Sequence, residues 1–364
     1  MRRGIQRQTP SERQSVPLCV TIARMSPLAF NSPTPLRVLM LGATGTIGRA
    51  TVRALLQRGR AVVGLVRPGT LAHAQNTLSE QLTPEWLQHL TLRECSLIDP
   101  DAIAAIGLQG EPFDAVVSCL ASRSGTPTDA WAIDHAAHLH VLHAVQRTGV
   151  RQFVLLSAIC VQKPRLAFQH AKLAFEQALI ESGLNYSIVR PTAFFKSLSG
   201  QIDRVRRGKP FLVFGNGRLT ACKPISDTDL ADFLAGCLSD VTRHNRVLPV
   251  GGPGPALTPL DQVRLLSQAL GREVPVRHVP LGLMGAIVAT LSLMGHLVPG
   301  LRAKAELARI GRYYASESML VLNPVTGLYD EKATPSWGTQ TLSEHYASVI
   351  QNGQSVDLGE HGLF

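Results

Sequence analysis

A glycine-rich loop directly after an apolar run constrains the fold of this chain more than any other feature. The apolar run covers 38–41, and the loop at 42–48 separates it from an amphipathic stretch over 49–59. A buried strand, a tight glycine turn and a helix N-terminus form a cradle for a pyrophosphate, because glycines let backbone N–H groups approach the phosphates. The sequence therefore predicts a dinucleotide-binding βαβ unit. Its predicted cofactor-binding residues are Gly42, Thr44, Gly45, Thr46, Ile47 and Gly48.

Short apolar runs alternate with helical stretches through the first half of the chain. Strands are expected at 61–66, 90–97, 115–120, 153–157 and 186–190, and helices at 130–148 and 168–182. This alternation is typical of a parallel sheet covered on both faces, so we expect a doubly wound α/β Rossmann fold. We assign 36–192 to the NADP-binding core and 193–350 to a smaller, mixed substrate lobe with elements that return to complete the sheet. Residues 1–35 are expected to be a basic, disordered extension, and 351–364 a tail.

The chain carries a net charge of +10, and part of it lies in the first 36 residues. Nucleic acid is not the expected partner, because the basic residues form no aromatic-interleaved stripe and no helix-turn-helix pattern accompanies them. An anionic small molecule or a membrane surface fits better. The N-terminal segment lacks the apolar core of a secretory signal. We expect a cytoplasmic protein of a photosynthetic bacterium, with a plastid protein as the alternative if 1–35 is a transit peptide.

Neither the cysteines nor the histidines predict a metal site. The six cysteines are widely spaced and include no CxxC pair, which argues against zinc and iron–sulfur centres. Four histidines between 135 and 143 spread around a helix and do not converge on one point.

A run without charged residues covers 279–301. Its length approaches that of a membrane span, but Gly282, Gly285, Gly295, His296 and Pro299 argue against a span. A buried helix or pocket lid is the favoured interpretation, and a peripheral membrane contact and a transmembrane helix are the alternatives.

The end of the second predicted strand indicates which cofactor is bound. NAD-dependent enzymes usually place an acid there for the ribose 2′-hydroxyl, whereas this chain has Arg67. A guanidinium pairs with a 2′-phosphate, so NADPH is the expected cofactor. The loop after the fourth strand, with Cys119, Leu120 and Ala121, is expected to pass the ribose and nicotinamide side.

The catalytic position departs from that of ordinary short-chain dehydrogenases. Those enzymes follow the fifth strand with a Ser and then a Tyr-x-x-x-Lys helix motif, in which Tyr gives a proton to a carbonyl oxygen. Here Ser157 ends the strand and Lys172 is in register, but Phe168 occupies the position of Tyr. Because Phe cannot donate a proton, we expect Ser157 and Lys172 to serve a reaction other than carbonyl reduction.

Several further segments carry a family resemblance. They are the blocks 190–197, 214–226 and 310–319, together with the glycine loop, Arg67 and the Phe-x-x-x-Lys variant. Over about 36–350 the chain resembles the NADPH-dependent divinyl chlorophyllide a 8-vinyl reductases, which are atypical short-chain dehydrogenases related to isoflavone reductases and NmrA-like proteins.

The resemblance implies reduction of the 8-vinyl group of divinyl chlorophyllide a, or of a close precursor, to ethyl. It leaves two alternatives: a non-catalytic NmrA-like NADP-binding sensor or assembly factor, and an NADPH reductase of another conjugated substrate. Hydride added to the vinyl group leaves charge that spreads into the tetrapyrrole, so no oxyanion needs a Tyr donor.

The remaining site expectations concern the cofactor and the flat, apolar substrate. Lys172 would orient the cofactor, and the proton would come from solvent or an acidic side chain. Pro191 is expected beside the cofactor, and an Arg of 204–207 or Lys196 beside the substrate carboxylate. The predicted substrate contacts are Phe168, Phe194, Phe195 and Lys223.

Overall fold

The computed structural model of the chain describes Met1 and residues 36–298 and 300–353. The expected N-terminal extension and nearly all of the expected tail lie outside the described residues.

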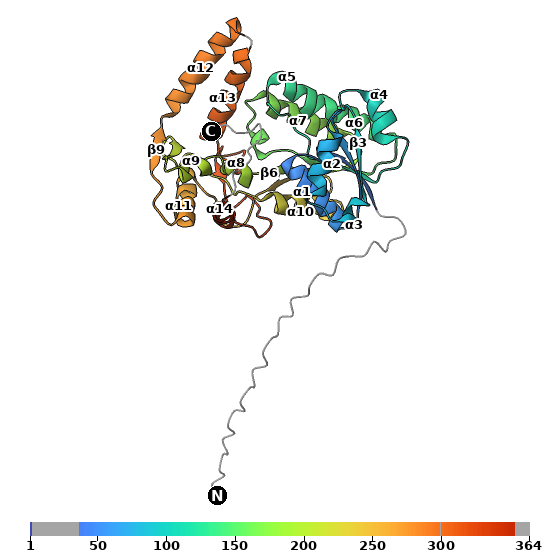
Figure 1. The fold of residues 1–364 in the computed structure, drawn as a ribbon, viewed down its shortest axis with the longest axis horizontal. Helices are drawn as coiled ribbons and strands as arrows, with labels where there is room; N and C mark the ends of the chain where they lie inside the picture. The colour runs from blue at the N-terminus through green and yellow to red at the C-terminus, as the bar shows by residue number, and fades with distance from the viewer. Residues whose placement is uncertain (2–35, 299, 354–364) are drawn as a thin grey trace.

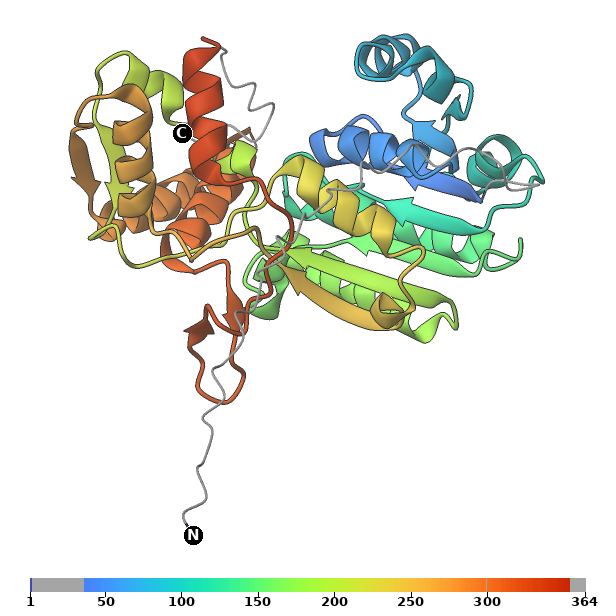
Figure 2. The same ribbon diagram turned by 90° about the horizontal axis from the view of Figure 1, so that it is seen from below.

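A seven-stranded parallel sheet forms the core of the larger lobe (Figure 2), with the strand order β3-β2-β1-β4-β5-β6-β8. This order confirms the predicted doubly wound Rossmann fold, since the chain runs outward from β1 in one direction and then in the other. The sheet strands are β1 (Arg37–Leu41), β2 (Ala61–Val66), β3 (Leu90–Glu94), β4 (Ala115–Ser118), β5 (Gln152–Leu156), β6 (Asn185–Pro191) and β8 (Arg246–Val250).

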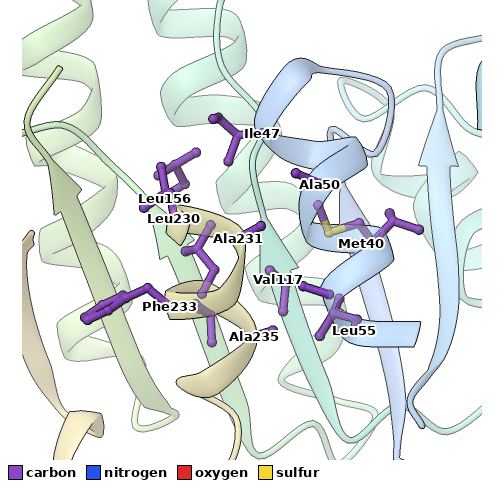
Figure 3. Close-up of a cluster of buried hydrophobic side chains, with 14 of the residues drawn as sticks. Met40, Ile47, Ala50, Leu55, Val117, Leu156, Leu230, Ala231, Phe233 and Ala235 are labelled. Carbon is purple, nitrogen blue, oxygen red and sulfur yellow. The ribbon is translucent and has the colours of Figure 1, made fainter. Parts of the chain in front are cut away.

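The strands bury side chains on both faces, as their continuous apolar runs require. Along β1, Val38 and Met40 join one core cluster, whereas Leu39 and Leu41 join the other, which follows the two-residue period of a strand. Figure 3 shows the first cluster, between the sheet and the helices α1 (Thr46–Gln57) and α10 (Asp227–Gly236).

Helices cover both faces of the sheet. The face of α1 and α10 also carries α2 (Leu71–Ser79) and α3 (Pro84–Leu87). The opposite face is covered by α4 (Pro100–Ala102), η1 (Ile103–Leu108), α5 (Pro127–Ala130), η2 (Trp131–Ala137), α6 (His138–Val145) and α7 (Ala167–Glu181). The predicted helix over 130–148 is thus built from α5, η2 and α6 in succession.

The C-terminal part forms a smaller lobe beside the sheet (Figure 2). Its strands are β7 (Phe211–Phe214) and β9 (Val276–Val279), which pair in parallel, and β10 (Val321–Leu322) and β11 (Tyr329–Asp330), which pair antiparallel. Its helices are α8 (Phe195–Leu198), α9 (Ile202–Arg206), α11 (Pro259–Leu270), α12 (Leu281–Leu297), α13 (Gly300–Ser316) and α14 (Leu342–Gln351). Two 3-10 turns, η3 (Ile159–Gln162) and η4 (Val241–Arg243), complete the elements.

The uncharged run forms α12, which pairs with α13 in a hairpin that projects from the body (Figure 1). The expectation of a buried helix is wrong, because Leu283, Ile287, Leu293 and Met294 are exposed. Of the helices in the described part of the chain, none has the length and apolar content needed to cross a membrane.

Candidate functional site

The glycine loop joins β1 to α1 in a conformation that requires glycine at two positions. Gly42 has φ +74°, and a Cβ there would lie 2.7 Å from the backbone of Cys119 and Leu120. A Cβ on Gly48 would lie 1.9 Å from the carbonyl oxygen of Gly42. These close approaches hold the loop after β4 against the glycine loop, so the structure brings these predicted cofactor segments together.

The middle glycine of the loop, Gly45, leaves space for a ligand. Gly45 is exposed and is the N-cap of α1, and a Cβ there would meet only the Gly42 oxygen, at 3.6 Å. No side chain caps the N-terminus of α1, and its first turn holds no acid. The N–H groups and partial positive charge of this helix end therefore fit a pyrophosphate.

Lys196 adds a positive charge at the glycine loop. It follows β6, and its Nζ donates to Oγ1 of Thr46 over 3.2 Å. We expected Lys196 or an Arg of 204–207 beside the substrate carboxylate, but the structure places Lys196 at the start of α1. The sequence shows no signal for this contact, because 150 residues separate its two partners.

Arg67 and Pro191 lie at the same edge of the sheet as the glycine loop. Arg67 directly follows β2, is exposed, and β2 pairs with β1. Pro191 is the buried last residue of β6. Because the carboxyl ends of parallel strands share one edge, both residues can border a dinucleotide that extends from α1 along that edge.

Lys172 is held by a carboxylate that the sequence analysis did not identify. Its Nζ donates to Oδ1 of Asp134 over 2.9 Å, and the Asp134 side chain has no exposed surface. Asp134 also accepts from Oγ of Ser122, at 2.6 Å, in the loop after β4. Asp134 lies among apolar residues of the predicted helix at 130–148. This position is the sequence signal that could have identified it as a buried carboxylate.

Ser157 is directed into a second buried network. Its hydroxyl donates to the carboxylate of Glu176, which also pairs with Arg190. Ser157 directly follows β5, at the edge of the sheet where the site lies. Its hydroxyl, however, bonds Glu176 and not Lys172.

The predicted substrate residues divide into two pairs. Phe168 and Phe194 are half-buried and retain some exposed surface. Phe195, in contrast, is only 3% exposed and packs in the core of the C-terminal lobe. Lys223 is buried, and its ammonium donates to the carbonyl of Thr334 over 3.1 Å. Phe195 and Lys223 therefore serve packing and lobe structure, and the geometry does not support their assignment as substrate contacts.

One of the clustered histidines supports the loop after β4. His138 bonds Oγ of Ser118 at 2.8 Å and the carbonyl of Ile133 at 2.8 Å. Burial, together with the charge of Lys172, lowers its pKa to about 4, so the ring is neutral at pH 7. These two hydrogen bonds make His138 a structural residue that supports the loop after β4.

Comparisons with known proteins agree with a dinucleotide-binding fold. Residues 42–241 match the NAD(P)H-binding family model. The NADPH-bound quinone oxidoreductase QOR2 of Escherichia coli superposes with a TM-score of 0.63 at 19% identity, covering 86% of this chain and 99% of that one, which supports the fold. A photosystem II assembly factor, Ycf39 of Synechocystis, is 24% identical over 68% of this chain and 72% of its own length.

Plant enzymes are much more similar. The chloroplastic divinyl chlorophyllide a 8-vinyl-reductase of Oryza sativa subsp. indica is 44% identical, covering 100% of this chain and 90% of its own length. Proteins of the same name from Zea mays, Arabidopsis thaliana and Cucumis sativus are 43–45% identical.

All four of these relatives are chloroplastic, which overturns the expectation of a cytoplasmic bacterial protein and points to a plastid. With a glycine loop that fits a dinucleotide and 44% identity over its full length to a member, the chain belongs to the NADPH-dependent divinyl chlorophyllide a 8-vinyl-reductase family.

Proposed function

We propose that this chain reduces the 8-vinyl group of divinyl chlorophyllide a, or of a close tetrapyrrole precursor, to an ethyl group with NADPH. One observation carries the proposal: Lys172 is retained and fixed on a buried carboxylate, while Phe168 stands where a carbonyl reductase needs a proton-donating Tyr. A carbon–carbon double bond conjugated with a large ring is a substrate that suits this combination.

NADPH would extend along the carboxyl edge of the sheet. Its pyrophosphate would lie over Gly45 and the N-terminus of α1, with Lys196 beside it, and its 2′-phosphate at Arg67. The backbone of 119–121 would flank the ribose, and Lys172 and Pro191 the nicotinamide half. When bound, the cofactor supplies a hydride.

In this arrangement Lys172 acts mainly as a positioning group. The ion pair with Asp134 restricts the movement of its ammonium group, so that it can hold hydroxyl groups of a ribose in a fixed place. Ser157 would act indirectly, by holding Glu176 and Arg190 behind α7.

The two parts of the chain would have different roles in binding. Residues 36–192 would bind NADPH, and 193–350 would shape the pocket for the flat substrate. The half-buried rings of Phe168 and Phe194 would offer apolar surface to the tetrapyrrole.

The hairpin of α12 and α13 would add a peripheral membrane contact. Its exposed apolar residues on α12 lie beside exposed basic residues of α13, namely Arg302, Lys304, Arg309 and Arg312. Apolar surface with neighbouring positive charge is complementary to an anionic lipid surface.

Spectroscopy tests the proposed activity directly. The purified protein is incubated with NADPH and divinyl chlorophyllide a, and we expect the Soret band to shift to the blue as the monovinyl product forms. Lys172→Ala should slow the shift sharply or weaken NADPH binding. If NADPH binds, as measured by its fluorescence, but the Soret band does not move, the chain is an NADP-binding sensor or assembly factor or acts on another conjugated substrate.

A further inference from the structure

The proposed reduction requires a proton, and the residues around Lys172 offer no evident donor. Phe168 has no acidic hydrogen. Asp134 and Glu176 form buried ion pairs with Lys172 and Arg190, so their carboxylates are engaged with these cations. A donor must therefore come from solvent or from another element of the fold.

The helix α13 brings the side chains of one of its faces to Phe168. A Cβ built on Gly125 would lie 3.0 Å from Cδ1 of Ile310 and 3.7 Å from Cδ1 of Phe168, so these two side chains border the same point. Tyr313 and Tyr314 follow Ile310 by three and four residues, so both lie on or beside its face of the helix.

Of the two adjacent tyrosines on α13, the first has a structural role. Tyr313 is buried, and its hydroxyl lies 2.9 Å from the carbonyl oxygen of Cys160 and 3.0 Å from that of Lys163. These bonds attach α13 to the turn η3 after β5. Tyr313 is therefore committed to holding the lobe against the sheet.

The second tyrosine is not committed in this way. The Tyr314 hydroxyl makes a weak hydrogen bond to Sγ of Cys160 at 3.7 Å, and its ring meets the ring of Tyr313 edge-on. Tyr314 as a whole is 40% exposed, although its hydroxyl end is buried. Burial raises its pKa well above the ordinary value, so the phenol keeps its proton across the neutral range. Cys160 lies in η3, which follows β5 and Ser157, so this hydrogen bond brings the hydroxyl to the edge of the sheet where the proposed site lies.

We propose that Tyr314 is the proton donor of the vinyl reduction. It comes from α13 and takes the role of the tyrosine that α7 lacks, because α7 carries Phe168 at that position. The inference rests on the proposed function. The hydride forms a C–H bond at one vinyl carbon as the π bond breaks, and its electron pair passes to the adjacent carbon and into the ring. The Tyr314 O–H proton then bonds to that adjacent carbon. The phenolate regains its proton from water, so the reaction consumes one NADPH and one proton for each ethyl group.

The test compares Tyr314→Phe with the matched control Tyr313→Phe. Loss of a general acid is expected to lower kcat of Tyr314→Phe by about 10²–10⁴-fold. The dissociation constants of NADPH and of divinyl chlorophyllide, measured separately by fluorescence quenching, should stay within about twofold. Tyr313→Phe should instead lower the melting temperature and leave kcat within about threefold.

Two additional measurements separate a proton donor from a structural residue. The residual turnover of Tyr314→Phe should increase with imidazole buffer concentration at pH 7, because an external acid replaces the phenol, whereas wild-type turnover should not. Tyr314→His, which restores an acidic hydrogen, should recover part of the rate even if Tyr314→Phe is poorly folded.

The outcomes are distinct. An active wild type together with a Tyr314→Phe variant of the same rate, independent of buffer, would overturn the donor role and leave the proposed function intact. A wild type that binds NADPH and the pigment but does not shift the Soret band would remove both.

Discussion

At the scale of single residues, the buried ion pair of Lys172 and Asp134 makes the sharpest prediction. The lysine is 12% exposed and the carboxylate has no exposed surface. Removing one partner leaves an uncompensated buried charge, which costs about 3–5 kcal/mol. Lys172→Met should therefore destabilise the protein by that amount in urea unfolding. The double variant Lys172→Met/Asp134→Asn should recover most of the stability, and neither should reduce the vinyl group at the wild-type rate.

The chain offers a matched control for this prediction. Arg151 is 77% exposed and pairs with Asp114 at 3.3 Å. An exposed pair contributes at most about 1 kcal/mol, so Arg151→Met should change stability little. A double variant at the buried pair that is as unstable as Lys172→Met would contradict our interpretation and would point to lost packing of the lysine stem.

Residues that act through local backbone geometry were predictable from the sequence, whereas those that act through distant partners were not. Gly42 and Gly48 follow from the motif, because its turn requires them. Lys196 was assigned to the substrate, and Asp134 was missed, because each meets a side chain from a different element. Spacing within one segment carries no information about such meetings.

At the scale of elements, the strands were predicted well and the helix α12 was not. The predicted strand at 61–66 matches β2, and that at 90–97 extends three residues beyond β3. A buried parallel strand has a continuous apolar run that only the sheet interior can accommodate. The apolar run of α12 has no such single explanation, since burial in protein and contact with lipid both favour it.

The exposed apolar and basic residues of the α12–α13 hairpin predict binding to anionic lipid surfaces. The protein should sediment with vesicles that contain phosphatidylglycerol and not with vesicles of phosphatidylcholine alone, and added salt should weaken this binding. Leu283→Glu/Leu293→Glu should weaken it at least about tenfold, because it places charges on the exposed apolar surface.

A control substitution distinguishes the hairpin from exposed apolar residues in general. Val325 is also strongly exposed but lies in the turn between β10 and β11. Val325→Glu should leave vesicle binding unchanged. Wild-type protein that fails to bind anionic vesicles even at low salt would exclude the membrane contact.

At the scale of the whole molecule, the cofactor half is completed by segments from well beyond it in the chain. The helix α10 packs against α1, and β8 closes the sheet beside β6. Lys196 reaches the glycine loop from the start of the second lobe. A ligand that bridges these segments should therefore stabilise both parts of the molecule together.

Because of this coupling, the preference for NADPH over NADH can be measured from the free energy of unfolding in the presence of each nucleotide. A ligand present at 100 times its dissociation constant stabilises a folded protein by about 2.7 kcal/mol. If Arg67 reads the 2′-phosphate, NADPH should raise the free energy of unfolding of the wild type more than NADH does at the same concentration. Arg67→Ser should reduce the NADPH effect to the NADH level. Arg246→Ser, at the opposite edge of the sheet at the start of β8, should leave the difference intact. Equal stabilisation of the wild type by both nucleotides would show that Arg67 does not select the cofactor.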